Sequence, residues 1–264
     1  MVDKKNPITV KINQPGADFK NQYPEIVRVE RQPAGLTFYQ INWKANAKGI
    51  VKLNMNDSSF AFDRVLGLIG SENNEEENLG IYQIVITSSI TDADKISHED
   101  ARKEFFSILR QIKNSGWSPI IPFTAPRLRG RDMLNYLLES GNPTTLDADY
   151  ELNIDEWMKI ENLTSWEFEK GKVFLDVSFV RNAAELEDQK STTYIVRYSI
   201  KSDVAYFKEF IDPNATDPWK LLLPGELKNS AERRSHLENS LEKTGIKIDK
   251  TYTNPKPPIV SGDD

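Results

Sequence analysis

The stretch ISHEDARKEFFSILRQIKNSGWSPIIPF, residues 96–123, carries the clearest folding pattern of the chain. Its apolar residues recur at three- and four-residue spacing, which predicts a helix over residues 96–114 with one buried face. Ser97 begins that helix and an acidic residue follows three positions later, as in a capping box. Gly116 can adopt the left-handed conformation that ends a helix. The apolar segment 117–123 follows directly, so the stretch predicts a helix that leads into a strand.

Alternating apolar and polar residues predict strands on both sides of this helix. The expected strands are residues 8–12, 26–31, 37–43, 50–54, 61–69, 81–90, 165–169, 172–181, 191–201 and 246–252, and residues 71–78 are expected to form an acidic loop. The other expected helices are residues 132–139, a short helix capped by Asn153 with Glu156, residues 203–211 and residues 229–244. The pattern therefore predicts an α+β fold with mostly antiparallel sheet.

Two stretches repeat one order of elements, namely strand, strand, helix, glycine and strand. If the repeat over residues 60–123 and 172–252 is real, the protein has two similar lobes, each a mostly antiparallel sheet with a packed helix. The expected domains are an N-terminal α+β lobe over residues 1–145, a C-terminal α+β lobe over residues 146–254 and a flexible tail over residues 255–264. Coincidence is the alternative, because a helix that ends on glycine and feeds a strand is common in α+β proteins.

The composition limits the possible classes of function. The chain has 264 residues, of which 38% are hydrophobic, and its formal net charge is −6. That negative charge argues against non-specific nucleic-acid binding, which relies on many basic residues. The absence of cysteine excludes disulfides, thiolate metal ligands and cysteine nucleophiles. No apolar run approaches the roughly 20 residues that a membrane-spanning helix needs.

The N-terminal residues bear on the location of the protein. Met1–Pro7 contains no hydrophobic signal region, which taken literally predicts a cytoplasmic protein. A polar start of this kind also suits the tether of a mature lipoprotein whose signal and lipidated cysteine have been trimmed away. The N-terminal residues alone leave two alternatives open, a cytoplasmic protein and a periplasmic protein whose membrane contact is only through such an anchor.

Motifs of established chemistry are missing from the sequence. His98 and His236 are the two histidines, and neither has a second histidine at zinc-ligand spacing. There is no Gly-rich phosphate loop and no Gly-x-Ser-x-Gly elbow. Asp147, Asp149 and Glu151 alternate as in a calcium loop, but the glycine and distal glutamate of an EF-hand are missing. We therefore expect no catalytic residues, no metal and no cofactor, although a pair of carboxylates brought together by the fold remains possible.

Two charged clusters are the candidates for binding a partner protein. They are Glu75, Glu76 and Glu77 in the expected loop, and Arg127, Arg129 and Arg131 in a turn before an expected helix. An acidic loop that projects from a sheet can enter a basic or polar cleft of a partner, and arginines pair well with carboxylates across interfaces. The alternative for both clusters is a solvated surface, as charge runs usually are.

The C-terminal half of the chain resembles a known family. The likeness is carried by Leu152–Met158, Trp166–Phe168, Val173–Arg181, Tyr194–Lys201, Trp219–Pro224, Leu237–Tyr252 and the pair Asn254-Pro255. These segments resemble immunity lipoproteins encoded beside type VI secretion effectors, notably those that protect against phospholipase toxins. The resemblance implies a periplasmic, non-enzymatic inhibitor, often two-lobed, that clamps its cognate toxin. The missing signal and lipidation cysteine depart from the family pattern, and the resemblance assigns no functional residues.

Three functions follow as hypotheses. The leading one is an immunity protein that binds a cognate antibacterial type VI secretion effector, expected to be a phospholipase, and occludes its active site. The second is a cell-envelope ligand-binding or scaffold lipoprotein without catalytic activity. The third is a hydrolase that uses acidic residues.

Overall fold

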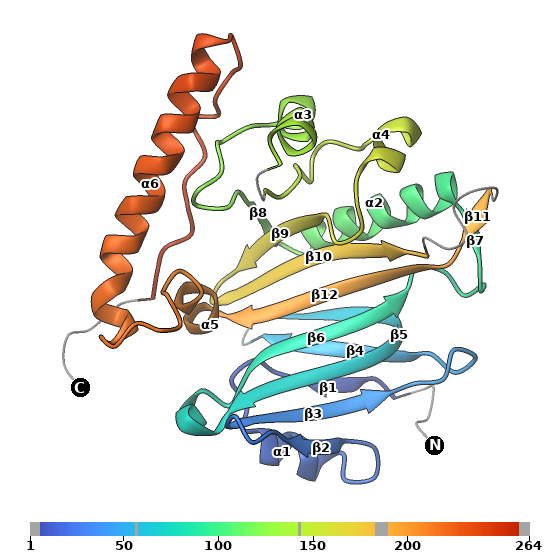
Figure 1. The fold of residues 1–264 in the computed structure, drawn as a ribbon. Coiled ribbons are helices and arrows are strands. Elements are labelled where there is room, and N and C mark those ends of the chain that lie inside the picture. The colour runs from blue at the N-terminus through green and yellow to red at the C-terminus, as the bar shows by residue number, and fades with distance from the viewer. Residues whose placement is uncertain (1–5, 56–57, 142–143, 183–189, 259–264) are drawn as a thin grey trace.

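A computed structural model describes residues 6–55, 58–141, 144–182 and 190–258 of the chain. Within these residues, the main feature is a ten-stranded sheet. Figure 1 shows how its strands are arranged. The elements in chain order are β1 (Ile8–Val10), α1 (Gly16–Gln22), β2 (Arg28–Arg31), β3 (Leu36–Asn42), β4 (Gly49–Met55), β5 (Ser58–Asn73), the 3₁₀ helix η1 (Asn74–Leu79), β6 (Ile81–Ser89), β7 (Ile96–Ser97), α2 (His98–Asn114), β8 (Ser118–Ile120), α3 (Gly130–Ser140), α4 (Ile154–Lys159), β9 (Ser165–Lys170), β10 (Val173–Arg181), β11 (Ser191–Thr192), β12 (Tyr194–Ser202), α5 (Asp203–Lys208) and α6 (Trp219–Lys243).

The strands of the sheet follow the order β1-β4-β5-β6-β12-β10-β9-β8, with β3 also paired to β5 and β2 to β3. The pair β1 and β4 is parallel, and the other described pairs of this sheet are antiparallel. Two successive hairpins, β4-β5 and β5-β6, build one half, and β9-β10 and β10-β12 build the other. A small second sheet joins β7 to β11.

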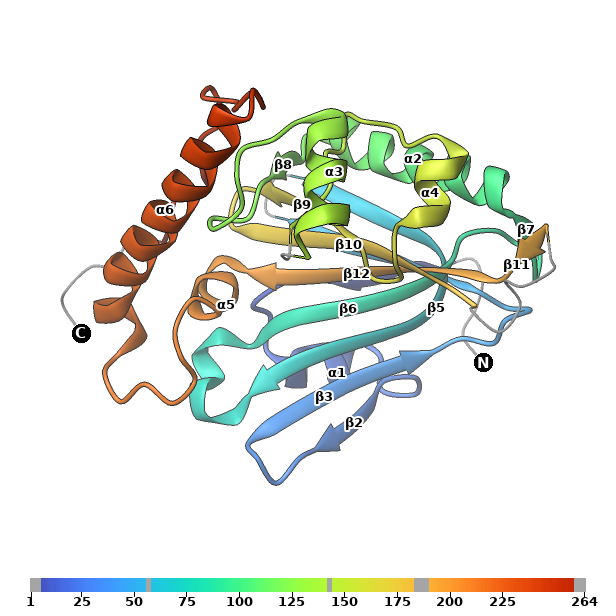
Figure 2. The same ribbon diagram turned by 45° about the horizontal axis from the view of Figure 1, so that its top comes forward.

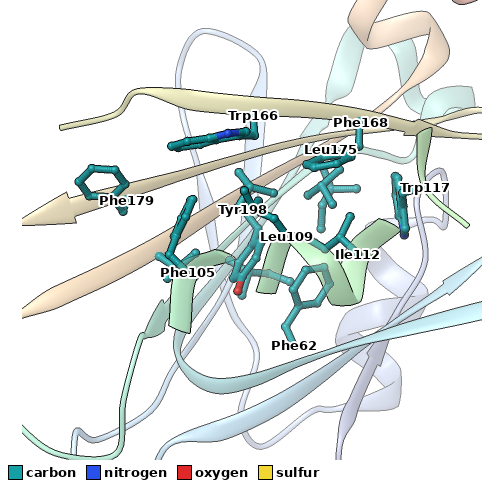
Figure 3. Close-up of a cluster of buried hydrophobic side chains, with 14 of the residues drawn as sticks. Phe62, Phe105, Leu109, Ile112, Trp117, Trp166, Phe168, Leu175, Phe179 and Tyr198 are labelled. Carbon is teal, nitrogen blue, oxygen red and sulfur yellow. The ribbon is translucent and has the colours of Figure 1, made fainter. Parts of the chain in front are cut away.

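The main core lies between the sheet and α2. Figure 3 shows Phe105 of α2 directed toward Trp166 of β9 and Phe179 of β10, with ring centroids 4.8 and 5.5 Å away. Phe62 of β5 meets Tyr198 of β12 at 4.7 Å, so aromatic residues from both halves of the chain share this core. Figure 2 shows α2, α3 and α4 gathered over the β8-β9-β10 end of the sheet, with α6 standing to one side.

The structure confirms the α+β class and several local predictions. The Ser97 side chain caps α2 by accepting a hydrogen bond from the Asp100 N–H at 3.0 Å. Asn153 and Glu156 form the expected capping box at the start of α4. The hairpin of β9 and β10 turns at Gly171 as expected, and α2 ends before Gly116, whose φ is +85°.

Some predicted elements need correction. The helix expected over residues 229–244 begins ten residues earlier, at Trp219, and includes Pro224 and Gly225, two residue types that usually interrupt helices. The segment 246–252 is not a strand. Its described backbone hydrogen bonds to other segments run from Ile246 N–H to the Leu241 carbonyl and from Asp249 N–H to the Arg127 carbonyl, and these two bonds do not form a ladder. The acidic loop 71–78 begins within β5 and continues as η1, and α1 was not predicted.

One sheet crosses the expected domain boundary at residues 145 and 146, in place of two separate sheets. β6 and β12, from the two expected lobes, pair over seven residues from Gln83–Lys201 to Ser89–Ile195. Each hairpin would otherwise leave a row of unpaired backbone groups at its edge, and joining the edges satisfies them. The expected strand–strand–helix order does occur in each half, but the two halves share a sheet and a core.

The end of the chain is partly packed against the fold. Asn254 accepts a hydrogen bond from Arg234 Nη1 at 2.7 Å and Pro255 is buried, so the start of the expected flexible tail is held in place. The tail residues 259–264, residues 142–143 near the expected boundary and residues 1–5 lie outside the described residues. Within the described part of the chain, every helix is too short or too polar to cross a membrane.

Candidate binding groove beside α5

Helix α5 packs on the sheet face opposite α2. Successive strand residues point to opposite faces. In β10, Leu175, Val177 and Phe179 belong to the main core, and so Phe174 and Asp176 point to the other face. Phe174 stacks on Tyr206 of α5 at 3.9 Å between ring centroids and joins a second, smaller cluster with Phe207. This small cluster fixes α5 over one end of that sheet face.

Two adjoining cavities lie beside α5, and we name them together the α5 groove. The first has a volume of about 290 Å³ and is lined by Gln83, Ile120, Glu167, Phe168, Phe174, Leu175, Asp176, Arg197, Ser199, Lys201, Tyr206 and Glu209. The second has a volume of about 490 Å³ and is lined by Asn73, Glu76, Leu79, Tyr82, Gln83, Lys201, Ala205, Lys208, Glu209, Ile211 and Pro213. The cavities share Gln83, Lys201 and Glu209 in their walls, which makes them parts of one surface feature.

The first cavity contains a pair of carboxyl groups on neighbouring strands. Glu167 of β9 and Asp176 of β10 are direct cross-strand partners, and side chains at such positions lie on the same face about 5 Å apart at Cβ. Burial, helped by the negative charge of Asp176, raises the pKa of Glu167 to about 7. Burial also raises the pKa of Asp176, although a hydrogen bond from Ser165 opposes the rise. Both groups therefore hold a proton more tightly than ordinary carboxyl groups do.

The basic side chains of the groove form ion pairs with some of its acidic side chains and not with others. Lys201 of β12 forms an ion pair with Glu209 at the end of α5, and Lys208 forms one with Glu76. Among the described residues, neither Glu167 nor Asp176 has an ion-pair partner within 4.0 Å. Arg197 lines the same cavity and acts on Asp176 from a greater distance. The acid pair is thus the part of the groove that is least neutralised.

Of the two acidic-cluster residues whose side chains the structure describes, one lines the groove. Glu76 lines the second cavity, where its ion pair with Lys208 lies on the wall. Glu75 is exposed, and its backbone N–H donates to the Asn73 side chain at 3.0 Å. The side chain of Glu77 lies outside the described ones. The structure therefore places Glu76 at the candidate site, whereas Glu75 is not part of its walls.

The three arginines chosen from the sequence are held by partners within the chain. Arg127 donates hydrogen bonds to the carboxylate of Glu238 in α6 from its backbone N–H, Nε and Nη2, at 2.7–2.9 Å. Arg129 donates to Asp249 at 2.8 Å, and Arg131 to the Tyr150 hydroxyl at 3.2 Å. None of these arginines lines the groove. They brace the turn against α6 and neighbouring loops, and only Arg131 leaves most of its side chain exposed, at 68%.

The residues considered for calcium also have other roles. Asp147 accepts bonds from the Gly130 and Asp149 N–H groups, and Glu151 pairs with Arg102 and Arg110. Within the described residues, no group of three or more His, Cys, Asp or Glu side chains is arranged to hold a metal ion.

Sequence reasoning missed the acid pair, although one signal for it was present. Asp176 is a lone acidic residue inside the otherwise uncharged and mostly apolar run VFLDVSFV of β10. A carboxyl group at the centre of a buried strand needs a partner or a cavity, because its burial in apolar surroundings is costly. The neighbour Glu167 could not be identified from the sequence, because the register between the strands decides which residues lie opposite each other.

Comparison with known proteins adds no name to this site. No protein-family model, no curated protein and no solved structure matches the chain.

Proposed function

We propose that the protein binds another protein through the α5 groove. The observation that carries this proposal is the charged lining of the groove, with acidic and basic side chains of η1, β9, β10, β12, α5 and the residue that follows α5 around two joined cavities. Pockets for small organic ligands are lined mainly by apolar and aromatic side chains. Charged linings of mixed sign favour recognition of a complementary polar protein surface, where they set orientation and association rate.

The resemblance supplies the class of partner. The segments that resemble immunity lipoproteins include Trp166–Phe168, Val173–Arg181 and Tyr194–Lys201, and these contain the acid pair and both cations of the first cavity. We therefore propose an immunity protein that neutralises a type VI secretion effector, of the phospholipase class, by covering its active site. A periplasmic location belongs to the same proposal.

The direct test uses the product of the gene beside the one that encodes this chain, which the proposal expects to be the effector. We expect the two purified proteins to elute as one complex and the effector's phospholipase activity to fall to near zero at equimolar ratio. Two separate elution peaks with unchanged activity would contradict the proposal.

A variant test addresses the groove itself. Replacing Glu75, Glu76 and Glu77 together by alanine should weaken effector binding about three- to tenfold, with a smaller effect at high salt. The melting temperature should remain close to that of the wild type, because a half-exposed pair such as Glu76–Lys208 contributes about 0–1 kcal/mol. Glu232→Ala, on the exposed face of α6, is the control. Unchanged affinity at both salt concentrations would argue against this edge of the groove.

A second candidate function is hydrolysis by the acid pair. The near-neutral pKa of Glu167, beside a second carboxyl group in a cavity, is a property of many proton-transfer sites. The effector complex and a hydrolytic assay separate the two candidates. Turnover of a glycoside or ester substrate that disappears in Glu167→Gln would favour hydrolysis, and stoichiometric effector binding without turnover would favour the immunity protein.

A further inference from the structure

The first cavity is suited in size to one side chain. Its volume of about 290 Å³ lies just below the range for ligand sites, about 300–1,000 Å³. The aromatic rings of Phe174 and Tyr206 line this cavity together with the polar side chains of β9, β10 and β12. A site of this size accepts the end of a long side chain rather than a large organic molecule.

The charges on the cavity wall favour a positive guest. The wall carries three carboxyl groups, those of Glu167, Asp176 and Glu209, against two cations, Arg197 and Lys201. The Lys201–Glu209 ion pair uses one group of each sign. Two adjacent carboxyl groups then face a single arginine that has no ion pair within 4.0 Å among the described residues. An entering cation would relieve the repulsion between the two acids, whereas an anion would add to it.

We propose that the cavity between Glu167 and Asp176 receives the guanidinium group of an arginine side chain of the partner protein. This inference rests on the proposed function, because it names the group that the partner inserts. A guanidinium group is planar, presents several N–H donors in a fixed fork and is more weakly hydrated than an ammonium group. Two carboxyl groups on adjacent strands offer acceptors side by side, which suits that fork better than the point charge of a lysine.

The binding should be coupled to release of a proton from Glu167. The groups that face this carboxyl are Asp176 on β10, Lys201 on β12, and Tyr206 and Glu209 from α5 and its end, with Tyr252 acting from further away. Near pH 7 Glu167 is partly protonated, because its pKa is raised to about 7. A guest cation stabilises the charged form, so binding should lower this pKa and should be weaker at pH 5.5 than at pH 8.

The experiment measures the pKa of Glu167 by carbon-13 NMR of its carboxyl group, with and without a peptide probe. The probe is acetyl-Gly-Arg-Gly-amide at millimolar concentration, and the matched control replaces arginine by citrulline, its uncharged isostere. We expect the arginine peptide to lower the pKa of Glu167 by about one unit or more, as an opposite charge within a few ångströms does. An unmoved pKa, or an equal shift with citrulline, would overturn the inference.

Variants and a smaller probe locate the effect. Asp176→Asn should weaken arginine-peptide binding about tenfold, and Glu169→Gln, on the same face of β9 but outside the cavity wall, should leave it unchanged. Equal losses in both variants would overturn the assignment to this cavity. Free methylguanidinium should bind more weakly than the peptide, and equal binding would overturn the assignment to a protein side chain.

The two proposals fail separately. If the effector binds but the arginine peptide leaves the pKa of Glu167 unchanged, only the guanidinium site is overturned. A pKa that responds to the arginine peptide, with no effector complex formed, overturns the proposed function alone.

Discussion

At the scale of single residues, Glu167 makes the stability of the folded protein depend on pH. Its pKa is raised from 4.5 to about 7 by burial, so the folded protein binds this proton more tightly than the unfolded chain. The stability that this group contributes is fully present below about pH 4.5 and is lost as the pH rises to about 7. Glu167→Gln should remove this loss, which is on the order of 3–4 kcal/mol at about 1.4 kcal/mol per pKa unit.

Urea unfolding between pH 4.5 and pH 8 tests this prediction. The unfolding free energy of the wild type should fall relative to that of Glu167→Gln as the pH rises, and the two should differ most near pH 8. Glu232→Gln, an exposed site on α6, serves as the control and should run parallel to the wild type. Parallel curves for Glu167→Gln as well would show that this carboxyl group titrates in the ordinary range.

Arg181 is a buried cation that binds carbonyl groups instead of a carboxylate. Its Nη2 donates to the carbonyls of Trp157 and Ile160 at the C-terminal end of α4, and its guanidinium lies 5.2 Å from the Phe179 ring centroid. Arg181→Met should destabilise the fold by about 2–4 kcal/mol, because two buried acceptors lose their donor. Arg181→Lys, which keeps a donor and a charge, should lose less. A methionine variant as stable as the wild type in chemical denaturation would mean that desolvation of the arginine cancels its hydrogen bonds.

Residue-scale predictions from the sequence were accurate where the chemistry is local. Ser97 and Asn153 cap their helices as expected, because a cap depends on residues within one turn of chain. The roles of Arg127 and Arg129 could not be predicted, because their partners Glu238 and Asp249 lie more than a hundred residues away in sequence. Their proposed exposure to a partner protein was an assumption about the surface that only the fold could test.

At the scale of elements, α6 is attached to the fold by an unusually polar stripe. Leu223 enters the small cluster below α5, but the next buried residues along the helix are Ser230, Arg234 and Glu238. Arg234 donates to the carbonyls of Ile121 and Pro122 at 3.3 and 2.6 Å. The C-terminal half of α6 is therefore held by hydrogen bonds and an ion pair more than by apolar contact.

We expect Glu238→Gln to loosen that half of α6 without unfolding the sheet. The change removes the negative charge opposite Arg127 and should cost about 1.5–3 kcal/mol locally, the usual range for hydrogen bonds to charged groups. Hydrogen exchange should accelerate over residues 230–243 and stay unchanged in β10 and β12. Lys228→Gln, at an exposed position of the same helix, is the control. Equal protection of the 230–243 amides in variant and wild type would contradict a polar attachment.

The extent of α6 also shows what element prediction missed. Only the part after Pro224 and Gly225 was predicted, because those two residues weaken the helical pattern, and the packing of Leu223 supports the extra turns that propensity alone does not. The expected strand over residues 246–252 failed for the opposite reason. Its alternation is strand-like, but the described residues offer it no ladder of backbone partners.

At the scale of the whole molecule, the two halves of the chain complete one sheet. The sequence predicts the α+β class, most of the strands and the β9-β10 hairpin, since period-two patterns and turn residues are local signals. The pairing of β6 with β12, which we call the β6–β12 seam, was not predictable. Gln83 donates a hydrogen bond to Ser199 across it at 3.2 Å, but the two residues are 116 positions apart in sequence. The α5 groove was missed for the same reason, since its walls come from both halves.

The seam yields the last prediction, which concerns whether either half can fold alone. A fragment of residues 1–145 would leave seven residues of β6 without their partners and would uncover Phe105 of α2, whose ring packs on Trp166 and Phe179 of the other half. Exposed strand edges and uncovered aromatic side chains both disfavour an independent fold.

We therefore expect this fragment to show no cooperative thermal transition by circular dichroism and poor dispersion in its NMR spectrum. Mixing it with residues 146–264 should restore both signals, because the two pieces together supply every strand of the sheet. A fragment of residues 1–145 that melts cooperatively by itself would mean that the chain is built from two independent lobes, and that the β6–β12 seam is an interface between finished domains. Failure to fold alone, with recovery on mixing, would establish the seam as part of a single folding unit.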